Sequence, residues 1–312
     1  LYLKARFYYN KYTPDATLKA IEYLNEAIAI DQAYAIAYSG LSFCLITLWY
    51  WNWMPAERSL PQRFIAAAQQ SLSMDDGIAE SHLAAGRVLL HYEKRIVEAA
   101  VEYRKSLAIN PNSAECHVQL AFCATLLGQY AEAGKHATLA DSLDPFSLMN
   151  LYFISFIYWA ADDHEKVLSY GNRLVDLEPN FFGGHLALGL VYLGTGRVEE
   201  AMAKLELSAA MNPDMLTLNS LASAYGAIGE RMKATAILER MKGIDRVQNA
   251  GSNFLGMVHA SIGELDTAFT YFEKAMDGRE PNMLWLKVSL RHNEDFMKDP
   301  RAKRLFERMG LA

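Results

Sequence analysis

The sequence predicts an all-α fold, a right-handed superhelical solenoid of about eight helix hairpins with a C-terminal capping helix. Pro111, Pro145, Pro179 and Pro213 lie 34 residues apart, and each follows Asn, Asp or Glu. A small side chain or a valine opens each second helix with the same step, apart from one step of 33, at Ala99, Ala133, Val167, Ala201, Ala234 and Ala268. The segments between these points have the period of amphipathic helices. A constant period of this length indicates hairpins that stack on their neighbours.

The hairpins are expected to form one continuous array over residues 1–312, because no linker rich in Gly, Ser or Pro interrupts them. The expected repeats are about 1–34, 35–78, 79–113, 114–147, 148–181, 182–214, 215–248 and 249–280, followed by a cap over 281–312. Repeats three to six should be regular. The second is irregular, because residues 49–61 make its connection about ten residues longer than a normal turn between helices.

The first hairpin should pair an aromatic helix over residues 1–11 with a second helix that starts near Pro14. In the eighth hairpin, Gly256 and Ala268 are small, so the two helices should cross closely there. In the cap, Asp299 and Pro300 suit the N-cap and the first position of a final helix.

Composition and charge bear on the class of partner and on location. The net charge is −6, from 30 basic and 36 acidic residues, and no long run of Lys or Arg is present, so direct contact with nucleic acid is not expected from this region. The longest apolar stretch, residues 151–161, is far shorter than the roughly 20 residues of a membrane helix. Sparse cysteines and the lack of a signal peptide suggest a cytoplasmic location. The lack of an initiator Met suggests a fragment of a longer protein.

Residues 114–147 show the repeat most clearly, with Leu120, Ala121, Ala124, Ala133 and Pro145 at set offsets. This arrangement resembles the tetratricopeptide repeat, which has W-x2-L-G-x2-Y, A-x3-F and a closing P within 34 residues.

The two ends resemble a narrower group. The start, YLKARFYYNKYTPDATLKAIEYLNEAIAID, and the closing PNMLWLKVS and DPRAKRLFERMGL look like a bacterial tetratricopeptide region. That region occurs in winged-helix transcription regulators of the invasion-regulator type, in class III nucleotidyl cyclases and in some serine/threonine kinases. The resemblance implies a sensory or partner-binding part of a signalling protein. The winged helix and the cyclase core lie outside these residues, so their activities are assigned to none of them.

In the resembled fold, the first helices line a concave groove through positions 2, 5, 9 and 12 of each repeat. The resemblance therefore implies a mostly apolar partner-binding groove that includes Tyr9, Tyr12, Phe43, Arg87, Glu115, Phe122, Tyr152, Phe156, Trp159 and Leu190. Its occupant could be a partner protein or peptide, the protein's own output domain, a second copy or a small apolar ligand. Alternatively, these side chains pack against the next repeat or against the C-terminal tail.

Three tryptophans in the long connection, Trp49, Trp51 and Trp53, have two interpretations. They form an interaction hot spot if the loop is extended, because alternate side chains then point to one side. They fill the gap left by the insertion if their rings are buried, which is the favoured interpretation.

No cofactor, metal site or enzymatic activity is expected for this chain. His82, His117 and His185 share one repeat position and are roughly 10 Å or more apart, too far to share an ion bound at about 2 Å, so packed, hydrogen-bonded histidines are favoured. No P-loop, GxSxG or paired Cys and His motif is present. The sequence thus predicts a protein–protein interaction or regulatory module of a bacterial signalling or transcription-regulatory protein. The alternatives are the regulatory or oligomerising half of a nucleotidyl (adenylate) cyclase, or a small apolar-ligand sensor.

Overall fold

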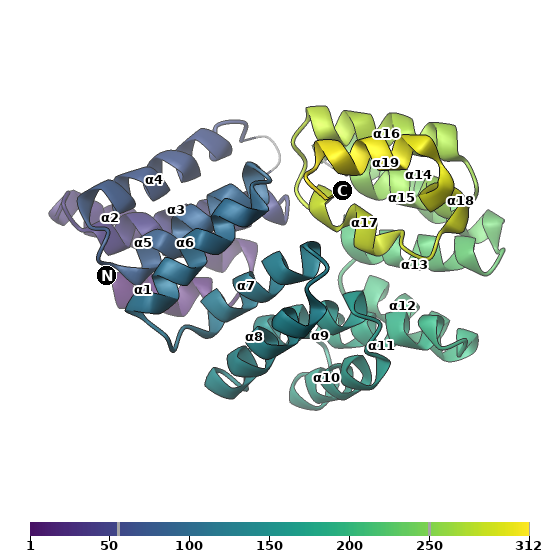
Figure 1. Ribbon diagram of the computed structural model, residues 1–312, viewed down its shortest axis with the longest axis horizontal. Helices are drawn as coiled ribbons and strands as arrows, with labels where there is room; N and C mark the ends of the chain where they lie inside the picture. Colours follow the sequence, from purple (N-terminus) through teal and green to yellow (C-terminus); the bar gives the residue numbers. More distant parts are fainter. Residues whose placement is uncertain (55–56, 249–250, 312) are drawn as a thin grey trace. The chain divides into compact units, whose positions relative to one another are not determined.

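The computed structural model describes residues 1–54, 57–248 and 251–311, and over these residues it is helical without a β-strand (Figure 1). The predicted all-α fold is confirmed. The chain divides into two compact units, Leu1–Cys123 (unit 1) and Ala124–Ala312 (unit 2). The predicted start of the last repeat at residue 249 and the final residue of the predicted cap lie outside the described residues.

Unit 1 consists of helix hairpins in which each first helix packs against its second helix, and the first helices of the first three hairpins contact one another in turn. We call the first helices A helices and the second helices B helices. The elements are α1 (Tyr2–Tyr9), α2 (Pro14–Ile30), α3 (Ala35–Tyr50), α4 (Leu60–Met74), α5 (Ala79–Arg87), the π-helical turn η1 (Val88–Tyr92), α6 (Ile96–Ile109) and the start of α7 (Ala114–Leu126). Because α1, α3 and α5 contact one another in turn, their side chains share one surface.

Unit 2 repeats this arrangement, with contacts between successive A helices from α9 to α15. Its hairpin helices are α8 (Tyr130–Leu143), α9 (Leu148–Ala160), α10 (His164–Leu177), α11 (Phe182–Gly194), α12 (Val198–Met211), α13 (Met215–Ala227), α14 (Arg231–Gln248), α15 (Ser252–Ser261) and α16 (Leu265–Asp277). The C-terminal elements are η2 (Met283–Trp285), α17 (Leu286–Ser289), α18 (Glu294–Lys298) and α19 (Pro300–Arg308).

The C-terminal elements pack on the last hairpin through aromatic rings, and α19 lies over α16 in Figure 1. The ring of Phe296 lies 5.2 Å from Phe269, 5.6 Å from Phe272 and 6.1 Å from Phe306. Asp299 accepts a hydrogen bond from the backbone N–H of Arg301 at 2.8 Å, and Pro300 is the first helical residue, as the sequence predicts.

Two connections differ from the sequence-based expectation. Helix α3 continues to Tyr50, so Trp49 is helical and the connection is shorter than predicted. The helix ends because Asn52 adopts a left-handed conformation (φ 55°) and the N–H of Trp53 bonds to the carbonyl of Leu48 at 2.8 Å. The third repeat is not regular, because the expected segment 79–113 is one residue longer than the period, and the π-helical turn η1 accommodates the extra residue.

Small residues at the crossings of A and B helices allow the backbones to approach closely. A Cβ atom placed on Gly86 would lie 2.4 Å from the ring of Tyr103. A Cβ on Gly189 would lie 2.6 Å from Leu205, and one on Gly256 would lie 2.5 Å from Phe272. Each of the three larger partners is buried. The close crossing expected at Gly256 is therefore present, and the same contact recurs in other hairpins.

The histidines that share one repeat position are packed and hydrogen-bonded. Each uses Nε2 to bond the carbonyl six residues before it, with distances of 2.9 Å for His82 to Asp76, 3.1 Å for His117 to Pro111 and 2.9 Å for His185 to Pro179. These bonds tie the turn between hairpins to the following A helix, which supports the structural interpretation over metal binding.

The glycine contacts lead to a stability prediction. Gly256→Ala should lower the free energy of unfolding by about 1–3 kcal/mol, because its methyl group would overlap the buried Phe272 ring. Gly243→Ala is the matched control: Gly243 lies exposed inside α14 with open space around it, so alanine should add up to about 1 kcal/mol through helix propensity. Urea unfolding of both variants checks this, and equal midpoints would contradict the close crossing.

Candidate functional site

Five of the predicted site residues come together on the A-helix surface of unit 1. We call Tyr9, Tyr12, Phe43, Arg87 and Glu115 the Arg87 cluster. The ring of Phe43 lies 4.7 Å from that of Tyr9 and 6.3 Å from that of Tyr12. The guanidinium of Arg87 lies 4.2 Å from the centre of the Phe43 ring. These side chains extend from the end of α1, the turn after it, the middle of α3, the end of α5 and the first turn of α7.

The charge of Arg87 is compensated inside this cluster. Its side chain is 7% exposed, and Nη2 donates a hydrogen bond to Oε1 of Glu115, whose side chain is 38% exposed. Burial lowers the pKa of the Arg87 guanidinium, and the carboxylate together with the face of the Phe43 ring stabilises its charge. Burial also raises the pKa of Tyr9 and Tyr12, so their hydroxyl groups stay protonated at neutral pH.

A half-buried histidine that was not among the predicted site residues belongs to the same helix surface. His91 lies in η1; its Nε2 is 3.1 Å from Oε1 of Gln119, and its ring lies 5.1 Å from that of Tyr50. Burial lowers the pKa of His91 to about 3, so it is neutral at physiological pH. The only signal for it was the extra residue in the third repeat, since the π-helical turn shifts the positions that face this surface.

The three tryptophans lie near the end of α3. Trp49 packs against Phe64 and Tyr92, with ring centres 5.7 and 5.6 Å apart. Trp53 also packs against the core of unit 1, and its ring stacks on that of Trp51 at 6.3 Å. All three side chains are half-buried, so the gap-filling and hot-spot interpretations both stay predictions.

The remaining predicted residues differ in their surroundings. Phe122 is buried on α7, and Leu190 is half-buried on α11. Tyr152 is buried against Phe181 and Phe182 at the start of the next hairpin, with ring centres 6.2 and 5.8 Å away. Tyr152 therefore packs against the neighbouring repeat, one of the two alternatives drawn from the sequence.

The end of α9 contacts the C-terminal part of unit 2. The rings of Phe156 and Trp159 stack at 5.1 Å, and Trp285 meets Phe156 edge-on at 5.0 Å. The guanidinium of Arg291 lies 4.2 Å from the centre of the Trp159 ring. We call Phe156, Trp159 and Asp162 the α9 surface, and residues 283–293 the internal segment. Phe156 and Trp159 therefore pack against the C-terminal tail, one of the alternatives drawn from the sequence.

Asp162 joins the α9 surface to the internal segment. Its Oδ1 accepts hydrogen bonds from Nη2 of Arg291 at 2.7 Å and from Nε2 of His292 at 3.1 Å. Burial alone would raise the pKa of Asp162, but the hydrogen bonds and charges of Arg291 and His292 outweigh it and hold the pKa below its usual value. Asp162 thus forms two interactions with residues about 130 positions further along the sequence.

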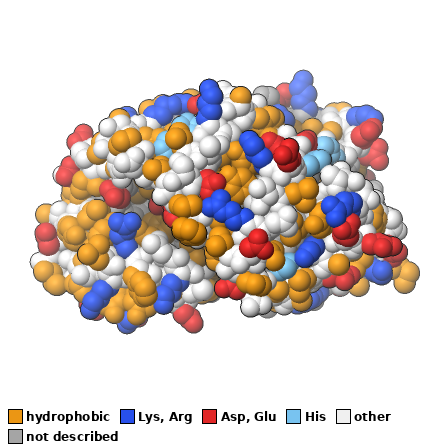
Figure 2. All heavy atoms as spheres, turned by 90° about the horizontal axis from the view of Figure 1, so that it is seen from below, with side chains coloured by type: hydrophobic (Ala, Val, Ile, Leu, Met, Phe, Trp, Pro, Cys, Tyr) orange, Lys and Arg blue, Asp and Glu red, His pale blue; other side chains and the backbone are white. Residues whose placement is uncertain are grey.

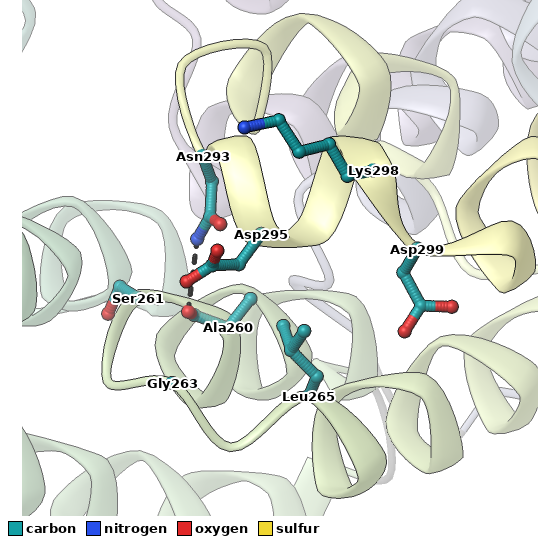
Figure 3. Close-up of a pocket in the computed structure, with 8 residues that line it drawn as sticks. All are labelled: Ala260, Ser261, Gly263, Leu265, Asn293, Asp295, Lys298 and Asp299. Atoms are coloured by element: carbon teal, nitrogen blue, oxygen red, sulfur yellow. Dashed lines mark hydrogen bonds between the residues drawn. The ribbon is translucent and has the colours of Figure 1, made fainter.

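A surface pocket of about 510 Å³ lies between the α15–α16 turn and α18. Figure 3 shows Asn293, which donates a hydrogen bond to the carbonyl of Ala260 at 3.0 Å, beside Asp295. Lys298 is paired with Glu294 at 2.6 Å, and Asp299 caps α19. Lys298 and Asp299 thus have structural roles at this pocket.

No group of three or more His, Cys, Asp or Glu side chains among the described residues could hold a metal ion. Cys44, Cys116 and Cys123 are buried and form no disulfide. None of the helices described has both the length and the apolar character needed to cross a bilayer.

The Arg87 cluster leads to a prediction on stability. Glu115→Gln should lower the free energy of unfolding by about 1–2 kcal/mol, because it leaves the buried Arg87 without its countercharge. Adding Arg87→Met should recover most of that loss, since an apolar side chain of similar length needs no countercharge. Urea unfolding of the single and double variants measures the difference. A double variant less stable than Glu115→Gln would contradict this account.

His91 leads to a prediction on pH dependence. Its folded-state pKa of about 3 lies below the value near 6.5 of an unfolded histidine. Between these two values the unfolded state binds a proton that the folded state does not. The free energy of unfolding is therefore highest above pH ~6.5 and decreases as the pH falls toward 3. The decrease near pH 5 should be on the order of 1–2 kcal/mol. His91→Gln should flatten this part of the stability curve relative to its own value at pH 8. Parallel curves for parent and variant would show that His91 does not titrate this way.

The chain is similar to known tetratricopeptide repeat proteins in part of its sequence and in its fold. A family model described as tetratricopeptide repeat matches residues 102–135. Anaphase-promoting complex subunit 3 of Schizosaccharomyces pombe is 28% identical over 146 residues, which are 46% of this chain and 21% of that protein. The match thus spans about a fifth of the length of this curated relative.

Solved structures match over most of the chain. The APC/C hetero-tetramer Cut9–Hcn1 has a TM-score of 0.60 at 15% identity, covering 94% of this chain and 52% of that one. The human IFIT1 dimer with m7Gppp-AAAA has a TM-score of 0.62 at 15% identity, covering 98% and 77%. A tetratricopeptide repeat protein from Parabacteroides merdae has 0.54 at 14%, covering 80% and 98%. At these identities the likeness shows the fold. Together with the family match, it supports a tetratricopeptide repeat region in this chain.

Proposed function

We propose that this chain is a protein–protein interaction region that binds a segment of a partner protein on the A-helix surface of unit 1. The observation that supports this most is the Arg87 cluster, in which aromatic and charged side chains from successive A helices converge around Phe43. A surface built from several stacked hairpins can bind an extended or helical segment along its length.

The accessible groups of the cluster define the partner chemistry. Tyr9 and Tyr12 are half-buried, so part of each side chain is accessible to a partner. Glu115 binds Arg87 through one oxygen, and a carboxylate can accept further hydrogen bonds. A segment with an aromatic or aliphatic residue and a nearby Lys or Arg fits this combination.

The overall charge supports a protein partner over nucleic acid. The chain has a net charge of −6, and on the face shown in Figure 2 basic and acidic side chains are interspersed. Nucleic-acid surfaces have clustered Lys and Arg. The acidic balance also favours association with a basic segment.

The kind of protein that contains this region is inferred from the sequences of its two ends. Their resemblance to a bacterial tetratricopeptide region supports a place in a cytoplasmic regulatory protein whose output domain, a winged helix or a nucleotidyl cyclase, lies outside these residues. In that setting the Arg87 cluster would bind a partner or the output domain itself.

Selection of random peptides displayed on phage tests the proposed surface. Selected peptides should share an aromatic residue and a Lys or Arg. Their affinity, measured by calorimetry, should fall at least about tenfold, or 1.4 kcal/mol, in Tyr12→Asn and in Glu115→Gln. Asparagine is chosen because position 12 has a left-handed backbone (φ 51°) that it tolerates.

The matched controls are Tyr130→Asn on α8 and Glu199→Gln on α12, which are exposed residues of the same types in unit 2. Both should bind the selected peptides as the parent does. Peptides whose affinity is unchanged by Tyr12→Asn and Glu115→Gln would contradict the proposed site.

A further inference from the structure

The internal segment contacts the α9 surface as a bound peptide would. Trp285 contacts the Phe156 ring, and Arg291 covers the Trp159 ring six residues further along. Nη2 of Arg291 donates to the carbonyl of Trp159 and to Asp162, both at 2.7 Å. Proteins recognise aromatic and guanidinium groups of a partner through the edges and faces of aromatic rings, backbone carbonyls and carboxylates.

Asp162 departs from the other A-helix turns of unit 2. In those turns the residue in the left-handed conformation is a glycine, at Gly128, Gly196, Gly229 and Gly263. Asp162 takes this conformation with φ 56°, which is less favourable for a residue with a Cβ atom. The turn itself does not need a carboxylate, so the aspartate is best explained by its bonds to Arg291 and His292.

The fit of the internal segment is incomplete. Within the described residues, Nε of Arg291 is buried and has no hydrogen-bond partner. A buried donor without an acceptor costs free energy. A segment from another protein that satisfies this donor, or that places the guanidinium differently, would bind the same surface more favourably.

The two ends of the internal segment differ in accessibility. Met283, Leu284 and Leu286 are buried and anchor it. At the other end the side chains of Arg291 and His292 are 16% and 71% exposed, and Asp162, the acceptor for both on the α9 surface, is 45% exposed. Displacement can therefore begin at Arg291 while the anchor keeps the segment nearby, at a high effective concentration.

We propose that Trp159 and Asp162 form a second peptide-binding site, for a partner segment that presents an arginine, and that Arg291 of the internal segment occupies this site as an intramolecular ligand. A partner arginine displaces the Arg291 end and takes its place on Trp159 and Asp162, while Trp285 stays on Phe156. This proposal concerns unit 2 and does not depend on the Arg87 cluster of unit 1.

A labelled peptide with the sequence of residues 281–293 tests the proposal in trans on the whole 1–312 chain. Measured by fluorescence anisotropy, it should bind the parent weakly, because the internal segment competes. Arg291→Ala should bind it at least tenfold more tightly. Arg308→Ala is the matched control: this arginine is paired with Glu273 in the same C-terminal part, and its loss should leave binding unchanged. Adding Asp162→Asn to Arg291→Ala should abolish the gain.

Circular dichroism and thermal melting verify that each variant is folded. Arg291→Lys, which keeps the charge but not the planar guanidinium, is the second variant and should show a smaller gain than alanine. Folded Arg291 variants that bind no more tightly than the parent would overturn the proposal. So would a gain that persists with Asp162→Asn, or unfolding of both Arg291 variants, which would make the internal segment purely structural. None of these results bears on phage selection at the Arg87 cluster.

Discussion

The close crossing of the two helices in each hairpin is the constraint on which the rest of this structure depends. Gly86, Gly189 and Gly256 leave no room for a Cβ atom against the side chain of the partner helix. Because the A helix lies tightly against its B helix, hairpins of nearly equal shape follow one another and successive A helices stay in contact within each unit. The A-helix surface, and with it the Arg87 cluster, exists because of these crossings.

Much of this arrangement could be predicted from sequence because it is local or periodic. Small residues and prolines at a fixed step determine where each helix begins, ends and crosses its partner. Tyr9, Phe43 and Arg87 hold equivalent positions of the first three repeats, so stacking brings them to one surface, and Glu115 lies in the first turn of the next A helix. The prediction was less accurate where the period changes. One extra residue in the third repeat becomes a π-helical turn, and this turn places His91 on the surface.

The contact between the internal segment and α9 could not be predicted in this way. In a solenoid, each repeat is expected to contact only the repeats next to it in sequence. Arg291 and Asp162 are about 130 residues apart, and no sequence period relates them. The one local sign was Asp162 at a turn where the other hairpins of unit 2 have glycine. A residue whose backbone conformation is energetically unfavourable at its turn indicates that its side chain makes a contact elsewhere. It does not show which residue that contact involves.

The two surfaces use the same chemistry in different ways, and the difference determines what each can bind. In both, an arginine lies on an aromatic ring and bonds a carboxylate: Arg87 with Phe43 and Glu115, and Arg291 with Trp159 and Asp162. Arg87 extends from an A helix, so it is a fixed part of its surface and leaves the tyrosines and Glu115 for a partner. Arg291 comes from a segment outside the repeats, so an equivalent arginine from another chain can replace it. In unit 1 the arginine is a permanent part of the binding surface. In unit 2 an arginine of a partner can compete with Arg291 for the α9 surface.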